Sequence, residues 1–115
     1  MTEINLFRHA ENVLDYEAGE VIFERGDDGD VMYAVIEGTV EVVLDDQVID
    51  EAGPGGIIGE MALVGATSRS ATARAATAAK VTPVGEQQFL QMVEHTPFFA
   101  LKVMRIMAER LRRRM

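Results

Sequence analysis

Short apolar runs separated by turn residues fill the chain between Val13 and Val84. Residues 31–36 are apolar at successive positions, so both faces of a strand there would be apolar. Residues 40–44 instead place apolar side chains at every second position, which is typical of a half-buried β-strand. Aspartates and glycines between such runs predict tight turns. The pattern predicts an antiparallel all-β barrel or sandwich.

The periodicity changes after Gly85. Apolar positions in residues 87–94 fit a short helix that packs on the β-structure. Thr96 followed by Pro97 is a helix-start signal, a capping hydroxyl before a proline at the first helical position. A second helix is therefore predicted over residues 97–112, with one broad apolar face made by Phe99, Val103, Met104, Ile106, Met107 and Leu111.

The length and composition fit a chain of one domain. At 115 residues it is long enough to bury a modest core, and its lack of cysteine excludes thiolate nucleophiles and zinc–thiolate sites. The early residues carry several charges and no apolar signal segment. No run of about eighteen apolar residues occurs. We expect a cytoplasmic protein without a transmembrane segment.

Charge is distributed unevenly along the chain. Residues 101–115 hold six basic side chains and one acidic one, a net charge of +5, whereas the whole chain carries −8. The rest of the chain is therefore strongly acidic, which argues against a nucleic-acid-binding domain. The terminal arginine run is expected to be a solvated helix end, where cations also suit the helix dipole.

Residues 57–72 combine groups that suit an anion. Gly59 allows a left-handed backbone or a close approach to a ligand, and residues 60–64 can form one helical turn with donors at its start. Arg69 offers a planar, permanently charged fork for two phosphate oxygens, and Ser70 adds a hydroxyl beside it.

The same run resembles the phosphate-binding cassette of the cyclic nucleotide-binding domain family. The residues that match the family pattern in register are Gly59, Glu60, Ala62, Leu63, Arg69, Ala71 and Thr72, with Met61 as a conservative replacement. Ile58 stands for the usual aromatic residue and Ser68 for a frequent proline. Similar segments upstream include 19–23, 33–38 and 53–55, so the resemblance covers about residues 13–111.

The resemblance implies a mainly β fold with α-helices, an antiparallel, jelly-roll-like β-roll over 13–84 that contains the cassette at 58–72. It also implies C-terminal helices over 86–112, all within a single cyclic nucleotide-binding domain over 1–115. Alanine-rich residues 71–79 would favour a helix by propensity, but their alternation fits the strand that the family has there.

The resemblance assigns the ligand contacts. Backbone N–H groups of Gly59, Glu60, Met61 and Ala62, with those of Ser70 and Ala71, would hold the cyclic phosphate. Arg69 would pair with its exocyclic oxygens. Glu60 would accept a hydrogen bond from the ribose 2′-hydroxyl, a role that suits a carboxylate. The expected ligand is cAMP, with cGMP as the other candidate and no further cofactor.

Other readings of the chain are weaker. His9 and His95 lie far apart in sequence, no metal-ligand set is expected, and no nucleophile–base constellation can be assembled, so the chain is predicted not to be an enzyme. The acidic residues at 27–30 fit a solvated turn better than a calcium loop. The alternative function is a structural or protein-interaction β-roll that no longer binds nucleotide.

The final helix is expected to act as a lid. Arg110 lies on its apolar face, where a flat guanidinium can stack on a purine or extend past the β-roll to solvent, and Leu111 follows it. Relatives fuse this unit to effector domains, whereas this sequence encodes none. We therefore expect a sensor that signals to an unidentified separate effector, or a domain of a larger protein; a homodimer is left open.

Overall fold

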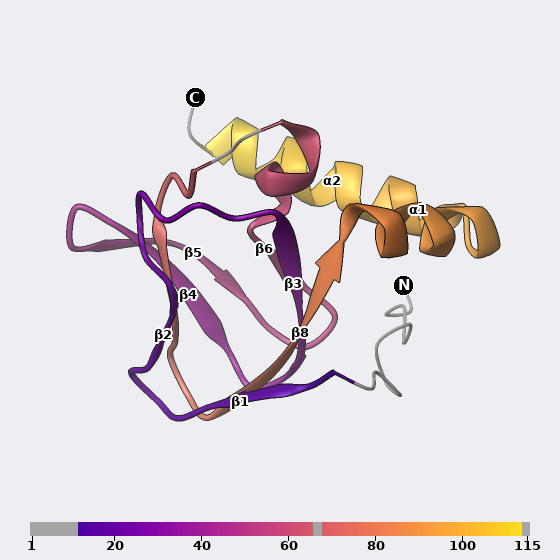
Figure 1. Ribbon diagram of the computed structural model, residues 1–115. Helices are drawn as coiled ribbons and strands as arrows, with labels where there is room; N and C mark the ends of the chain where they lie inside the picture. The colour runs from indigo at the N-terminus through magenta and orange to yellow at the C-terminus, as the bar shows by residue number, and fades with distance from the viewer. Residues whose placement is uncertain (1–11, 66–67, 114–115) are drawn as a thin grey trace. The chain divides into compact units, whose positions relative to one another are not determined.

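The computed structural model describes residues 12–65 and 68–113. Within it the chain forms two compact units, one ending at Gly85 and the other beginning at Glu86. The first unit holds all eight described strands and a short 3₁₀ helix, and the second holds two α-helices (Figure 1). The predicted mainly β fold with C-terminal helices is confirmed.

The first unit consists of two four-stranded antiparallel sheets. One sheet has the order β1-β8-β3-β6, and the other has the order β2-β7-β4-β5. Strands that are distant in sequence therefore lie side by side, as β1 and β8 do (Figure 1). The strands are β1 Leu14–Tyr16, β2 Val21–Phe23, β3 Val31–Glu37, β4 Val40–Leu44, β5 Gln47–Ala52, β6 Ile57–Ile58, β7 Thr72–Ala75 and β8 Ala79–Gly85.

The core of this unit is a cluster to which both sheets contribute. Its buried members are Val35, Ile58, Ala79 and Val81 from one sheet and Val40, Ala52, Ala73 and Ala75 from the other. Small alanines make up half of this cluster. Removing such apolar area from water at about 25 cal/mol per Å² is the main stabilising contribution to a β-structure of this kind.

Within the alanine-rich segment 71–79, residues Thr72–Ala75 form strand β7 as predicted, whereas residues 76–78 lie between β7 and β8, which begins at Ala79. Ala73 and Ala75 are buried, while Thr72 and Arg74 on the other face are partly exposed. Glu41 pairs with Arg74 across the sheet, and their side chains lie 2.7 Å apart. Burial and cross-strand pairing therefore override the helix propensity of alanine at this position.

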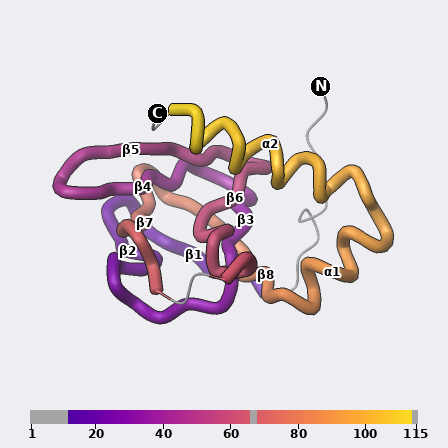
Figure 2. Tube along the Cα trace, turned by 90° about the horizontal axis from the view of Figure 1, so that it is seen from above, coloured from indigo at the N-terminus to yellow at the C-terminus, as the bar shows by residue number. Residues whose placement is uncertain are grey.

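The β4–β5 hairpin closes through a two-residue turn at Asp45 and Asp46. Both residues have positive φ, 52° and 63°, which is the backbone of a type I′ turn. Aspartate tolerates this left-handed region better than most residues with a side chain. The turn lies at the tip of the hairpin, which projects to the left past the neighbouring strands in Figure 1 and Figure 2.

The second unit is a pair of packed helices, α1 Glu86–His95 and α2 Phe98–Arg113. Both helices occur where predicted, within a residue or two. The rings of Phe89 and Phe99 lie 5.5 Å apart, and Phe99 is buried. The less exposed face of α2 is narrower than predicted, because Met104 and Leu111 are 55% and 64% exposed.

Few of the N-terminal predictions fall on described residues. His9 lies outside the described residues, which begin at Asn12. The carbonyl of Asn12 accepts a hydrogen bond of 2.8 Å from the Thr82 hydroxyl on β8. His95 is exposed at the end of α1, as expected for a surface histidine.

Candidate functional site

The site begins at the turn between β6 and the 3₁₀ helix η1, Glu60–Val64. Gly59 caps this helix in the left-handed conformation, with φ 72° and ψ 20°, which confirms the backbone role predicted for it. A Cβ atom at Gly59 would lie 2.7 Å from Nη1 of Arg69. Glycine is therefore required there for two reasons: the backbone is left-handed, and a side chain would collide with Arg69.

Arg69 is buried although it carries a charge, with 7% of its surface exposed. Its Nη1 donates to the Gly59 carbonyl at 3.2 Å, and its Nη2 donates to the Val31 carbonyl at 2.8 Å. The Gly59 carbonyl also accepts from the Ala62 N–H at 3.2 Å. The guanidinium is thus held directly against the first residue of the predicted phosphate cradle.

The backbone of Arg69 is fixed by the loop that joins β2 to β3. The Arg69 N–H donates to the Asp27 carbonyl at 2.8 Å, and the Arg69 carbonyl accepts from the Gly26 N–H at 2.8 Å. Asp28 and Ser68 form an antiparallel bridge alongside these bonds. The acidic segment 27–30 therefore packs beside Arg69 and contacts its backbone, consistent with the predicted turn.

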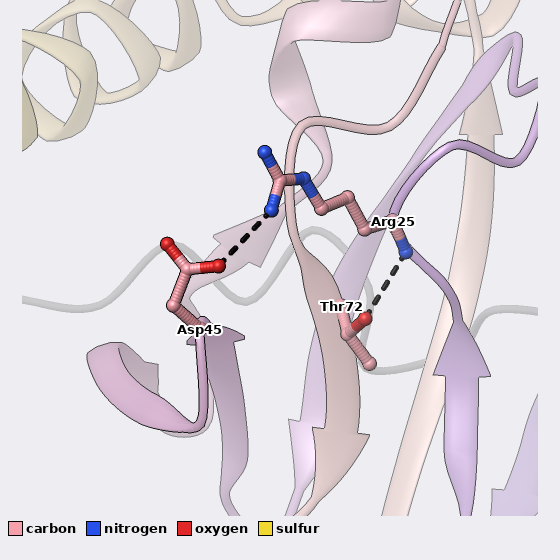
Figure 3. Close-up of polar contacts among 3 residues, drawn as sticks. All are labelled: Arg25, Asp45 and Thr72. Atoms are coloured by element: carbon pink, nitrogen blue, oxygen red, sulfur yellow. Dashed lines mark hydrogen bonds and ion pairs between the residues drawn. The ribbon is translucent and has the colours of Figure 1, made fainter.

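A second tie joins the same loop to β7. The backbone N–H of Arg25 donates to the Thr72 hydroxyl at 3.0 Å, and its side chain reaches Asp45 at 3.3 Å (Figure 3). Arg25 and Asp45 are mostly exposed, so their ion pair adds little to stability. The bond to Thr72, the last residue of the cassette, keeps the loop close to the strand that follows Arg69.

Two aromatic side chains support Arg69. Its Cζ lies 4.2 Å from the ring centre of Phe23 and 5.8 Å from that of Tyr33. The two rings are stacked with centres 6.0 Å apart. Gly29 lies so close to the guanidinium that a Cβ atom there would overlap Arg69 Nε.

Sequence reasoning missed these supporting residues. Phe23 and Tyr33 are ordinary strand residues by pattern, and Gly29 is an ordinary turn glycine. They lie 36 to 46 positions before Arg69, and only the folded loop brings them to it. Aromatic residues at inward positions of β2 and β3 are the only signal that the sequence offers.

The charge of Arg69 is not paired with any described carboxylate. Within residues 12–65 and 68–113, the ion pairs join Arg25 to Asp45, Arg74 to Glu41 and Lys80 to Asp15, and none involves Arg69. Arg69 Nε is buried and makes no hydrogen bond to any described residue. A buried cation with neutral partners is arranged to attract an anion.

The remaining predicted contact residues line the same stretch of chain. Glu60 is buried with 9% exposure, and Ala71 is buried with 6%. Met61 is half exposed and Ser70 is exposed, so the side chains of these two residues face solvent. The assignment of all seven cassette residues to a ligand stays a prediction.

The predicted lid residues belong to the helical unit. Arg110 is partly buried and Leu111 is exposed on α2, and their contact with a ligand stays a prediction.

Among the residues that the structure describes, no group of three or more histidine, aspartate or glutamate side chains could hold a metal ion. Neither described helix is long and apolar enough to cross a membrane.

Three comparisons agree on the kind of protein. A family model described as cyclic nucleotide-binding domain matches residues 13–96. A cyclic nucleotide-gated potassium channel of Mesorhizobium japonicum is 40% identical over 83 residues, 72% of this chain and 23% of the channel. A cAMP-dependent protein kinase regulatory subunit of Eremothecium gossypii is 46% identical over 59 residues, 51% of this chain and 13% of the subunit.

The fold has a close counterpart among solved structures. A chain solved in work on a cyclic-GMP-dependent signalling pathway that regulates bacterial phytopathogenesis superposes with a TM-score of 0.74 and 28% identity, covering 96% of this chain and 94% of that one. This chain spans less than a quarter of the length of the channel and the kinase subunit. With the family model matched over most of its length, the chain belongs to the cyclic nucleotide-binding domain family.

Proposed function

We propose that this chain binds a 3′,5′-cyclic purine nucleotide through Gly59, Glu60, Met61, Ala62, Arg69, Ser70 and Ala71. One observation carries the proposal. The buried guanidinium of Arg69 is fixed beside Gly59 and, among the described residues, has no carboxylate partner. A cyclic phosphate supplies an anion that pairs with this guanidinium.

The roles follow from chemistry and position. Arg69 pairs with the exocyclic phosphate oxygens, because its planar fork presents two parallel donors. Glu60 accepts the hydrogen bond of the ribose 2′-hydroxyl. Its position next to Gly59, whose carbonyl contacts Arg69, puts the two charged residues at the same end of η1. The exposed Ser70 hydroxyl lies where it can reach either the phosphate or the base.

The preferred nucleotide in this proposal is cAMP. The relative with the higher local identity is a cAMP-dependent kinase subunit, and its match supports the preference. The structural relative from a cyclic-GMP-dependent pathway supports the opposite choice. Ser70 is the residue on which the two ligands would differ, since its hydroxyl can bond the 2-amino group that only guanine carries.

A β-roll that has lost nucleotide binding is the second candidate. One observation favours it: both terminal nitrogens of Arg69 already bond to backbone carbonyls, as they would in a purely structural arginine. The two candidates differ in what happens on adding ligand. A binding site responds to a cyclic nucleotide, and a structural arginine does not.

Calorimetric titration separates these candidates. Wild-type protein and Ser70→Ala are titrated with cAMP, cGMP and 5′-AMP, the last as a control that carries an open phosphate. The proposal expects saturable binding of the cyclic nucleotides, tighter for cAMP, and weaker binding of 5′-AMP. A loss confined to cGMP in Ser70→Ala would reverse the stated preference, and no heat with either cyclic nucleotide would favour the structural β-roll.

We further propose that the chain is a sensor rather than an enzyme, with α2 as its lid over the base through Arg110 and Leu111. A ligand moves such a helix only by as much as its affinity differs between the two positions. Hydrogen exchange should then show new protection at residues 100–112 when cAMP is added. A truncation that ends at Arg105 should still bind, but more weakly; unchanged exchange at saturating cAMP would exclude the lid.

A further inference from the structure

We infer that Phe23 is a positioning residue for Arg69, and that its aromatic ring, not only its volume, sets the affinity for cyclic nucleotide. The inference rests on the proposed function of Arg69. Its starting observation is the geometry of the guanidinium, whose central carbon lies 4.2 Å from the centre of the Phe23 ring. At this distance the negative face of the ring attracts the cation.

The attraction to the Phe23 ring matters because the guanidinium has few other partners among the described residues. Two of its nitrogens donate to the carbonyls of Val31 and Gly59, and the third, Nε, has no hydrogen-bond partner among the described residues. No described carboxylate lies within ion-pair distance of Arg69. The ring is therefore a principal electrostatic partner of a charge that is almost fully removed from water.

A neutral partner has a functional advantage over a carboxylate here. A carboxylate would hold the guanidinium equally well but would cancel the charge that attracts the phosphate. The Phe23 ring and the two carbonyls fix the arginine and leave its formal charge uncompensated. Tyr33, stacked on Phe23 at 6.0 Å, holds the ring in turn.

Packing alone is the competing account of Phe23. The side chain is partly buried and contacts the main core cluster, so any large apolar residue would then serve. The two accounts differ in what they predict for replacements of similar size. Packing predicts that affinity follows volume, whereas a cation–π contact predicts that it follows the electron density of the ring.

The experiment replaces Phe23 by leucine, tyrosine and tryptophan, and by phenylalanines that carry one, two or three fluorine atoms. Affinity for cAMP is measured by calorimetry. We expect Phe23→Tyr and Phe23→Trp to retain affinity and Phe23→Leu to lose roughly threefold to thirtyfold. Affinity should fall stepwise with each fluorine, because fluorine withdraws electron density while changing volume little. In an Arg69→Gln background the same fluorine series should be flat.

A second measurement needs no ligand. In nuclear magnetic resonance spectra of the ligand-free protein, the Arg69 Nε–H and side-chain resonances should carry a ring-current shift that Phe23→Leu removes. Phe89→Leu, a change of the same kind in the helical unit, serves as the control and should leave these resonances in place.

Each outcome decides one question. Equal cAMP affinity across the fluorine series, or an unchanged Arg69 shift in Phe23→Leu, would overturn the inference. If the wild-type protein binds neither cAMP nor cGMP while Phe23→Leu still removes the Arg69 shift, the proposed function fails and the ring contact stands. Graded affinity together with the loss of the shift supports both.

Discussion

Arg69 and Arg74 lie five residues apart, just before and within strand β7, and their surroundings differ. Arg74 is partly exposed and pairs with Glu41 at 2.7 Å across the sheet. Arg69 is buried, bonds to two carbonyls and an aromatic ring, and pairs with no carboxylate among the described residues. Arg74 therefore has its counterion within the fold, whereas Arg69 has none among the described residues, as the proposed anion site requires.

This difference has a consequence for how each charge acts. A partly exposed pair such as Arg74–Glu41 is partly screened by water and stabilises the fold modestly. A buried cation held by neutral groups is costly to the fold but interacts strongly with an incoming anion. The loop between β2 and β3, together with Val31 at the start of β3, supplies the hydrogen bonds that hold Arg69 in this position.

The largest effect should follow Arg69→Ala. We expect it to weaken binding of cAMP by about 2–4 kcal/mol, because a charge-assisted pair at a water-poor site loses one partner. Arg69→Lys should recover little, since an ammonium cannot make the paired contact. Calorimetry checks both, with Arg74→Ala as the control. Equal losses for the two alanine variants would break the contrast between the arginines.

Gly29→Ala should have the next largest effect. Its Cβ would overlap Arg69 Nε and Cζ, so the guanidinium must move. We expect the free energy of unfolding to fall by about 1–3 kcal/mol, as overpacking usually costs, and cAMP affinity to fall with it. Gly53→Ala is the matched control, because its Cβ would meet nothing within 4 Å. Denaturant titration and calorimetry test the pair, and retained affinity in Gly29→Ala would contradict the close fit.

Breaking the ion pair between Arg74 and Glu41 should lower the stability of the fold only slightly. Arg74→Ala, Glu41→Ala and the double variant should each lower the free energy of unfolding by about 0.5–1 kcal/mol, with a coupling of similar size. Nucleotide affinity should stay unchanged in all three. A double-mutant cycle by urea denaturation measures the coupling. A fall in affinity for Glu41→Ala would show that the two arginines are not independent.

The smallest effect should appear at Lys80, a paired cation on the surface. Its hydrogen bond to Asp15, at 2.6 Å, and the charge of that carboxylate raise the pKa of Lys80 above its ordinary value of 10.5. Because the pKa is raised in the folded state, the stabilisation is complete below pH 10.5 and is lost as pH rises through the raised pKa. Thermal midpoints of wild type and Asp15→Asn should therefore differ slightly at pH 8, and the difference should shrink as pH rises beyond 10.5. A constant difference across that range would contradict this.

The sequence predicts most of the fold because each element carries its own local signal. The alternation in β4 and β7, the glycine at the start of η1 and the change of period at Gly85 all rest on residues close together in the chain. The β7 strand also needed the family resemblance, since alanine propensity alone favours a helix.

The residues that support Arg69 could not be predicted, because they carry no local signal in the sequence. Its partners Phe23, Gly29 and Val31 come from the β2–β3 region, and only the antiparallel sheets bring them to the cassette. Contacts between distant segments leave no periodic trace in a single sequence. Likewise, the exposure of Met104 and Leu111 on α2 depends on packing that an apolar pattern does not specify.

The most direct test of the central claim is a crystal structure of this protein with cAMP bound. The account predicts that the cyclic phosphate lies over the backbone from Gly59 to Ala62, with its exocyclic oxygens about 2.7–2.9 Å from the Arg69 guanidinium. The Phe23 ring should remain against the same guanidinium. A nucleotide bound elsewhere, or an Arg69 that still contacts only the Gly59 and Val31 carbonyls, would contradict it.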